Sequence, residues 1–395
     1  MKIRCKASVL SEALGLAEKA CEKKLTIPIL GCVDILAEES VTMRTTDLAV
    51  SLSVGVVGAE VLEAGRACVK IQLLLPLVRT MTGDVELSTD QDDWMRVTCP
   101  GSKHRIMGFN PSQFPDVFEP PTTSFYAPAA EVKKMVSRVA VSAAARGDFR
   151  YRLSGALLLV NSGVLAMVST DTHRLSHATL ELPEVPHSLS IDSFVSSEAF
   201  PIIEALPGEK IGIGEGPSQL FFVGDGMTLW IRKVTGNYPN WRAAFPSGPA
   251  ALVSLRPSRV VDALRRLLVT APKMNSMTEW LLMASTEESL EATPASITIS
   301  TRSPEAGESE EALEATSEGL QSANIVLNGS YLLDFFSRAE GDDPIVAEFR
   351  GPLTVLLLSA PGWKHLIMPI NIKHPLGTTP KGPPAGSDVP QEATA

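Results

Sequence analysis

The sequence has few cysteines, few aromatic residues and no long uninterrupted apolar run. All five cysteines lie in the first quarter of the 395 residues, and no two are spaced as Cys-x-x-Cys. This pattern argues against a disulfide framework or a zinc site and predicts buried thiols in a reducing compartment. The most apolar stretch, residues 154–168, is interrupted by Asn161-Ser162-Gly163 and is too short to span a bilayer. The N-terminal residues also lack the apolar core of a signal peptide, so we expect a soluble cytoplasmic protein without a membrane partner.

Recognisable catalytic motifs are also absent. The sequence contains no G-x-x-x-x-G-K-[ST], no G-x-S-x-G and no H-E-x-x-H. His173 and His177 are four residues apart, but in the extended segment that we expect there, this spacing is too long for shared metal ligation. We therefore predict no enzymatic activity, no metal and no cofactor. An enzyme that uses the neighbouring Asp171 and His173 stays open as an alternative.

Basic residues are outnumbered. There are 35 Lys and Arg residues against 45 Asp and Glu residues, which gives a formal net charge of −10. As a sum, this argues against nucleic-acid binding, which needs a basic surface. The excess of acidic over basic residues is unevenly distributed along the chain. Residues 249–372 hold nine basic and 16 acidic residues, whereas residues 127–248 hold 11 of each. Many basic residues gather in or just after three helix-like segments, namely Lys19, Lys23, Lys24, Lys133, Lys134, Arg138, Arg146, Arg150, Arg152, Arg256, Arg259, Arg265, Arg266 and Lys273.

Three similar units follow one another along the chain. Each begins with an amphipathic segment whose apolar residues recur at helical spacing, continues through paired strands and a second helix, and ends in closing strands. The first helices are expected at Ala7–Lys24, Pro128–Ala144 and Arg256–Thr270, the second helices at Ile71–Met81, Ser197–Leu206 and Ser330–Ala339, and the closing strands at Trp94–Phe109, Leu220–Thr235 and Thr354–Ile372. This order predicts an α+β chain of three repeated domains, each with two helices packed on antiparallel sheets.

The predicted domains span residues 1–122, 127–248 and 251–372, and a disordered Pro-rich tail follows at 374–395. Within the units, Val41–Leu52 and Val164–Leu180 are each expected to form one strand. The acidic run from Glu305 to Glu314 is expected to be a solvated loop. The closing strands of the first two units end in a similar step of an aromatic residue, Pro and Asp or Asn.

Seven short motifs occur in the order found in one protein family. Ser169–Leu175 contains Thr-Asp-Thr-His-Arg-Leu, which resembles the T-D-x-H-R-L motif of the bacterial DNA polymerase III beta subunit, the sliding clamp. The other matching segments are Ile27–Gly31, Thr46–Leu48, Phe149–Gly155, Gly236–Trp241, Asn328–Asp334 and Met368-Pro369. The resemblance covers about residues 1–372 and leaves only the tail outside.

The resemblance implies the DNA clamp fold and a head-to-tail homodimer that closes into a ring of six similar domains. The helices would line the hole and face duplex DNA without sequence preference. By family position, the residues nearest the DNA are Lys24, Arg146, Arg150 and Arg152, and the same helical surfaces add Lys19, Lys134, Arg138 and Arg266. Clamp-fold proteins that bind partners without encircling DNA are the alternative interpretation.

The resemblance also implies a pocket for short client peptides similar to Q-L-x-L-F, between the second and third domains. Such peptides would come from the DNA polymerase III catalytic subunit, the clamp loader, and other polymerases and repair proteins. The pocket residues carried over are Leu153, Thr170, Thr172, His173, Arg174, Leu175, Pro239, Ala243, Ala244, Asn328, Tyr331, Thr354, Leu366, Ile367, Met368, Pro369 and Ile370. Ala243 and Ala244 stand where the family often has an Arg and a larger apolar residue, which predicts a shallower wall.

The dimer interface is expected to join the first domain of one protomer to the third domain of its partner. The first domain would contribute Lys103, Arg105 and Met107. The third domain would contribute Leu268, Val269, Glu308, Glu310 and Glu311. The glutamates would face the basic residues of the partner.

Overall fold

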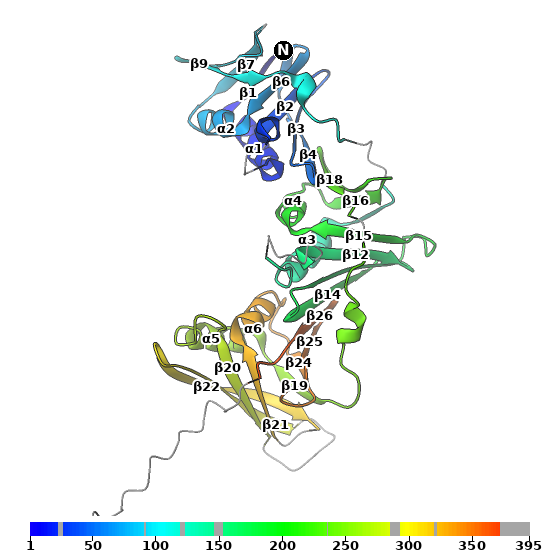
Figure 1. Cartoon of the computed structure of the whole chain (residues 1–395), viewed down its shortest axis with the longest axis vertical. Coiled ribbons are helices and arrows are strands. Elements are labelled where there is room, and N and C mark those ends of the chain that lie inside the picture. The colour runs from blue at the N-terminus through cyan, green and yellow to red at the C-terminus, as the bar shows by residue number, and fades with distance from the viewer. Residues whose placement is uncertain are drawn as a thin grey trace, which may run out of the picture. The chain divides into compact units, whose positions relative to one another are not determined.

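The computed structural model describes residues 1–22, 27–90, 92–118, 123–145, 153–234, 236–284, 293–319 and 322–371. The chain divides into two compact units (Figure 1). One unit combines Met1–Ala244 with Pro361–His365, and the other combines Phe245–Ala360 with the described residues after His365. Within these ranges no helix is both long and apolar enough to cross a membrane. The predicted tail lies outside the described residues.

The first repeat pairs two helices with two antiparallel sheets. Its elements are β1 (Lys2–Lys6), α1 (Ala7–Ala17), η1 (Glu18–Ala20), η2 (Pro28–Gly31), β2 (Cys32–Ala37), β3 (Val41–Thr46), β4 (Val50–Gly55), β5 (Glu60–Glu63), β6 (Gly65–Lys70), α2 (Ile71–Arg79), β7 (Asp84–Thr89), β8 (Met95–Cys99), β9 (Ser102–Ile106), β10 (Gly108–Phe109) and η3 (Pro111–Gln113). One sheet has the order β5-β1-β7-β8-β9, which places β9 at its edge.

The second repeat has the same plan. Its elements are β11 (Phe125–Pro128), α3 (Ala129–Ala140), β12 (Gly155–Asn161), β13 (Val164–Thr170), β14 (Arg174–Glu181), β15 (Ile191–Ser196), η5 (Ser197–Ala199), α4 (Phe200–Ile203), β16 (Lys210–Glu215), β17 (Gln219–Gly224), β18 (Met227–Arg232) and η6 (Trp241–Ala244). Strands β15, β12, β13 and β14 lie side by side in that order and are antiparallel.

A nine-stranded sheet runs through both of these repeats in the order β10-β6-β2-β3-β4-β18-β17-β16-β11. The connection is the antiparallel pairing of β4 with β18, in which Val54 lies opposite Met227 and Val50 opposite Ile231. Backbone hydrogen bonds therefore hold the first two predicted domains together in one unit. The predicted boundaries of the three domains stay predictions.

The second unit is built around one long antiparallel sheet. Its elements are β19 (Ala251–Leu255), α5 (Pro257–Leu267), β20 (Met277–Ala284), β21 (Thr293–Ser303), β22 (Gly307–Glu318), β23 (Ser322–Asn328), α6 (Gly329–Phe336), β24 (Ile345–Phe349) and β25 (Leu356–Ala360). Its strand order is β25-β24-β19-β22-β21-β20-β23. Strand β26 (Trp363–Ile367) begins in the first unit and ends in the second.

The helices form where the apolar periodicity predicts them. Helix α5 buries Val260, Leu264 and Leu267, and α3 buries Val132 and Val139, at helical spacings. Side chains at these spacings share one helix face, and each fully buried aliphatic side chain contributes roughly 1.5–3 kcal/mol. The α+β expectation with helices packed on antiparallel sheets is confirmed.

Two predictions about strands are wrong. Residues 41–52 and 164–180 each contain two strands separated by a tight turn, because an Asp side chain organises a turn that contains neither Gly nor Pro. Apart from Glu305, which lies in the turn before β22, the acidic run belongs to that strand rather than to a loop. Leu313 and Ser317 of this strand are buried while Glu308, Glu310 and Glu314 are exposed, so these three glutamates occupy the solvent-facing positions of a half-buried strand.

Candidate DNA-binding and peptide-binding surfaces

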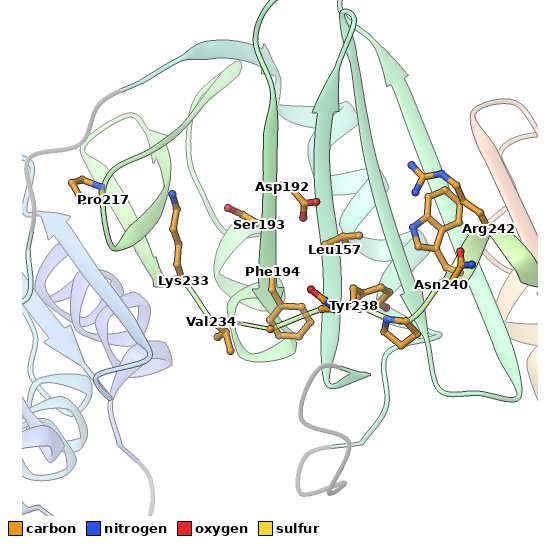
Figure 2. A pocket seen from close by; sticks show the side chains of 14 residues that line it. Leu157, Asp192, Ser193, Phe194, Pro217, Lys233, Val234, Tyr238, Asn240 and Arg242 are labelled. Atoms are coloured by element: carbon orange, nitrogen blue, oxygen red, sulfur yellow. The ribbon is translucent and has the colours of Figure 1, made fainter.

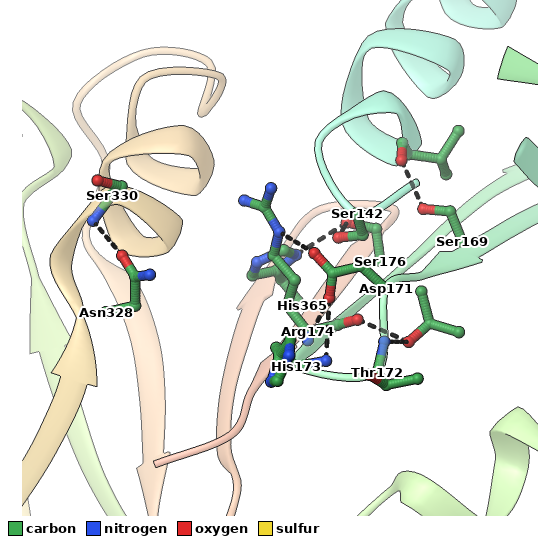
Figure 3. Close-up of polar contacts among 12 residues, drawn as sticks. Ser142, Ser169, Asp171, Thr172, His173, Arg174, Ser176, Asn328, Ser330 and His365 are labelled. Atoms are coloured by element: carbon green, nitrogen blue, oxygen red, sulfur yellow. Dashed lines mark hydrogen bonds and ion pairs between the residues drawn. The ribbon is translucent and has the colours of Figure 1, made fainter. Parts of the chain in front are cut away.

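The turn between β13 and β14 is held by its own side chains (Figure 3). Asp171 Oδ1 accepts hydrogen bonds from the backbone N–H groups of His173 at 3.0 Å and Arg174 at 2.9 Å. The other carboxylate oxygen pairs with Arg174 Nε at 3.0 Å, and both side chains are largely buried. Thr170 Oγ1 accepts from the N–H of Thr172, whose φ of 78° is left-handed. Asp171 is therefore committed to fixing the positions of His173 and Arg174, which weakens the alternative of an acid–base site here.

The first repeat contains the same turn between β3 and β4. Asp47 Oδ1 accepts from the N–H groups of Ala49 at 3.0 Å and Val50 at 2.7 Å. Thr46 Oγ1 accepts from the N–H of Leu48, whose φ is 73°. The Thr-Asp pair thus builds one local structure twice. The two turns differ in charge, because Val50 occupies the place of Arg174.

A buried polar network lies beneath the second turn. Ser176 Oγ is 2.8 Å from His365 Nδ1 and 3.0 Å from Ser142 Oγ (Figure 3). Ser169 donates a hydrogen bond to the carbonyl of Val139 at the end of α3. Buried polar groups are stable when they pair in this way. The network fixes β13 and β14 against the helix and so supports the turn at Asp171.

Aromatic residues attach the segment after β18 to the sheet formed by β12–β15. Tyr238 donates to the carbonyl of Val168 at 3.3 Å, and its ring centroid lies 6.4 Å from that of Phe194. The Trp241 ring lies 4.9 Å from the ring of His177. Burial raises the pKa of Tyr238, and burial together with the nearby Lys364 and Arg242 charges lowers the pKa of His177. The Gly236–Trp241 motif therefore works as an anchor of the segment.

A groove of about 680 Å³ follows this anchored segment (Figure 2). Phe194 and Tyr238 lie in its middle, and Lys233 and Arg242 lie toward opposite ends. Of the residues predicted for the client pocket, the groove includes Pro239 alone. This groove is consequently a different surface from the predicted pocket.

The first unit holds nine of the predicted pocket residues. Thr170, Thr172, His173 and Arg174 belong to the turn. Leu153 and Leu175 are buried, and Ala243 and Ala244 are exposed in η6, one helical turn past Pro239. The shallow wall that the sequence predicts at these two alanines stays a prediction.

The second unit holds the remaining predicted pocket residues. Asn328 Oδ1 accepts from the N–H of Ser330 at 2.9 Å and so caps α6, which contains Tyr331 (Figure 3). Leu366 and Ile367 are buried in β26, whereas Met368 is exposed. Ile370 donates its N–H to the carbonyl of Val326 at 2.7 Å, which places Pro369 and Ile370 along β23, and Thr354 precedes β25. That the two groups form one pocket stays a prediction.

The residues predicted to contact DNA differ in their exposure and in their ion pairing. Lys24, Arg146, Arg150 and Arg152 lie outside the described residues. Lys19 is exposed at the end of the first helix, in η1. Lys134 pairs with Glu131 at 2.7 Å, and Arg266 forms a two-pronged pair with Glu311 at 2.6 and 2.9 Å. The charge of both residues is therefore partly compensated within the chain.

Arg138 is a correction to the predicted DNA-binding set. It is only 5% exposed, its Nη1 donates to the carbonyl of Pro361 at 3.1 Å, and its guanidinium lies 5.3 Å from the ring centroid of Trp363. A guanidinium enclosed in this way is unavailable to phosphates, although the sequence places it on a helix with other basic residues. Arg138 binds the start of β26 to α3.

The residues predicted for the dimer interface lie on exposed surfaces. Met107 is 57% exposed and Val269 78% exposed. Lys103 and Arg105 are exposed on the edge strand β9, where Arg105 pairs with Asp90 at 2.9 Å and covers the Trp94 ring. Glu308, Glu310 and Glu311 lie on β22, and Leu268 is partly exposed just after α5. Their pairing across an interface stays a prediction.

Among the described residues, no three His, Cys, Asp or Glu side chains come together in a way that suits a metal ion.

Sequence reasoning missed a buried charged cluster, in which Asp34 is fully buried and its carboxylate lies 2.7 Å from both Arg44 Nη2 and Arg66 Nε. The three residues lie on adjacent strands, so their sequence spacing carried no signal. Arg44 also covers the ring of Phe118 at 4.8 Å, which links the cluster to the segment after the first repeat.

Comparisons with known proteins agree with the repeat structure. The family model of the DNA polymerase III beta subunit, N-terminal domain, matches residues 1–118, and that of the central domain matches residues 127–240. The beta sliding clamp of Caulobacter vibrioides is 26% identical over 391 residues, covering 94% of this chain and 100% of that protein. The corresponding protein of Pseudomonas aeruginosa is 26% identical over 341 residues, covering 85% and 89%.

Solved structures show the same fold. The DNA polymerase sliding clamp from Bacillus subtilis has a TM-score of 0.84 at 21% identity, covering 94% of this chain and 99% of that one. The Pseudomonas aeruginosa sliding clamp bound to griselimycin has a TM-score of 0.82 at 22% identity, covering 94% and 100%.

Proposed function

This chain belongs to the DNA polymerase III beta subunit family and is a DNA sliding clamp, and from this we propose how it holds DNA and its clients. Two protomers associate head to tail into a closed ring around duplex DNA. The ring then tethers client proteins through short peptides. The clamp contributes binding rather than chemistry, as a processivity factor.

Two exposed strand edges support ring closure. In the described part of the chain, β9 pairs only with β8, so its other edge is unpaired. Strand β22 pairs with β19 only over Thr316–Glu318, so the edge of β22 that faces away from β21 is unpaired before Thr316. Exposed edges readily pair with another chain. Lys103 and Arg105 on β9 are opposite in charge to Glu308 and Glu310 on β22, so this pairing would also be electrostatically complementary. A two-fold axis would repeat the contact twice and close the ring.

DNA would be retained by topology, with weak attraction at the inner surface. Lys19 is exposed near the end of the first helix, and Lys24, Arg146, Arg150 and Arg152 follow the first helices in sequence. Lys and Arg contacts to phosphates are independent of sequence and weaken with salt. A small number of such contacts suits a protein that must slide along DNA. A net charge of −10 does not prevent retention, because DNA could leave a closed ring only if the ring opened.

The client pocket would be organised by the turn at Asp171. The rigid positions of His173 and Arg174 and the exposed Met368 favour the insertion of apolar side chains from a Q-L-x-L-F peptide. The clients would be the polymerase III catalytic subunit, the clamp loader, and other polymerases and repair proteins. Ala243 and Ala244 would admit bulkier peptide side chains on their wall.

Retention on DNA of different topology tests the ring. Protein loaded on nicked circular DNA should stay bound through gel filtration in high salt and should be lost when the circle is linearised. Equal retention on both forms would contradict the ring and favour a protein-binding scaffold. A solution mass of one protomer at micromolar concentration would contradict the dimer directly.

A further inference from the structure

A cavity of about 470 Å³ lies beside the Thr46–Val50 turn, at the junction of the first and second repeats. Its lining includes Leu48, Val117, Phe118, Gln219 and Arg232, and all of these belong to the first unit. It lies beside the first-repeat turn that matches the Thr170–Arg174 turn, next to which the client pocket is predicted. The two turns have matching hydrogen bonds, and the similarity therefore extends to atomic detail.

Backbone and side-chain hydrogen bonds bring the walls together. Arg232 donates its N–H to the carbonyl of Ala49 at 2.8 Å, which fixes the end of β18 against the turn. Gln219 Nε2 donates to the carbonyl of Val117 at 2.6 Å, which fixes β17 against the segment after the first repeat. Phe118 is held edge to face on Trp230 at a centroid distance of 5.1 Å. The cavity is thus built from ordered elements.

Gln219 lines this cavity, and its side chain holds an enclosed acceptor that is unused. Its side chain is 7% exposed, and within the described part of the chain its Oε1 has no hydrogen-bond partner. The amide orientation is fixed because the Nε2 group already donates to Val117. A buried acceptor without a donor is unfavourable, so a ligand N–H that reaches it is strongly selected.

The rim supplies apolar contact and charge. Leu48 is an exposed leucine held at a φ of 73°, a conformation that is costly for a residue with a Cβ and that often marks functional positions. The side chain of Arg232 is exposed and forms no ion pair among the described residues. Asp116 also lines the cavity, which disfavours a ligand with several acidic groups.

We propose that this cavity is a second peptide-binding site, which takes a short linear peptide with one apolar side chain against Leu48 and Phe118 and one acidic residue near Arg232. A backbone N–H of the peptide donates to Gln219 Oε1. The proposal rests on the proposed function, because it treats the cavity as the first-repeat counterpart of the client pocket. A clamp protomer would then hold two peptides.

The test is a calorimetric titration of the full chain with the peptide Gln-Leu-Asp-Leu-Phe. The expected result is two binding events per protomer. Arg232→Gln and Leu48→Gly are surface changes that should each weaken one event by about tenfold and leave the other unchanged. For Arg232 this is the scale of one charge-assisted hydrogen bond, and for Leu48 it is the scale of one lost apolar side-chain contact. Met368→Ala should weaken only the other event, and the control Arg96→Gln, on an exposed arginine of β8, should change neither.

Several outcomes separate the two proposals. A single event that Met368→Ala weakens and that Arg232→Gln and Leu48→Gly leave unchanged would overturn the second site while supporting the client pocket. Two events of which neither responds to Arg232→Gln or Leu48→Gly would also overturn it. An event that responds to both of these variants, with no event that responds to Met368→Ala, would support the second site and contradict the proposed client pocket.

Discussion

Replacing Asp171 with Asn should loosen the turn that positions His173 and Arg174, and Asp47→Asn is the matched control. Asn retains an oxygen that can accept the two backbone hydrogen bonds, so this part of the change is shared by both turns. In the second turn Asp171 also pairs with Arg174, at 3.0 Å, with the two side chains 16% and 13% exposed, and Val50 stands at the corresponding place in the first turn. An exposed pair contributes roughly 0–1 kcal/mol and a charged hydrogen bond about 1.5–3 kcal/mol, so this partly buried pair should contribute about 1–2 kcal/mol.

Amide hydrogen exchange measures this difference directly. The amides of Arg174 and Val50 donate to equivalent aspartates, and each reports the opening of its own turn. Exchange at Arg174 in Asp171→Asn should accelerate by about five- to thirtyfold more than exchange at Val50 in Asp47→Asn, because 1.4 kcal/mol corresponds to tenfold. Affinity for a Q-L-x-L-F peptide should fall in Asp171→Asn. Equal acceleration at the two sites would refute the assignment of the extra stability to Arg174.

Two further predictions follow from the exposure or burial of charged and titratable side chains. Arg138→Ala should lower the free energy of unfolding by about 2 kcal/mol, since it loses a desolvated cation–π contact. The same variant should leave the slope of DNA affinity against salt concentration unchanged, because Arg138 is enclosed. Lys19→Ala should reduce that slope by about 0.9 per protomer. A smaller salt slope in Arg138→Ala would contradict this assignment and indicate that Arg138 contacts DNA. Burial lowers the folded-state pKa of His177 below its usual 6.5, so the unfolded state binds the proton more readily. The unfolding free energy should therefore decrease as the pH falls below about 6.5, and His177→Phe should flatten this dependence in denaturation measured between pH 7 and 5; an unchanged pH dependence in this variant would contradict it.

The helices and the repeated order were accessible to sequence reasoning because burial of one helix face imposes a local period. The stripe of Val260, Leu264 and Leu267 is visible in the sequence and is buried in the structure. The two Thr-Asp turns were hidden within apparent strands, because their chain reversal depends on a carboxylate that accepts backbone N–H groups. The acidic β22 was misjudged for a related reason, since its buried positions hold small or isolated apolar residues such as Leu313 and Ser317 between glutamates.

By itself the sequence determined the three repeated units, the α+β class and the uneven distribution of charge. These depend on residue order and on local periodicity. Only the tertiary structure decided which charges are available, because exposure and pairing depend on residues distant in the chain. Arg138 and Lys19 both belong to basic helical segments, yet Pro361 and Trp363 enclose Arg138 while Lys19 stays exposed. The cavity at Gln219 likewise exists only because β4 pairs with β18 and brings the first turn to the second repeat.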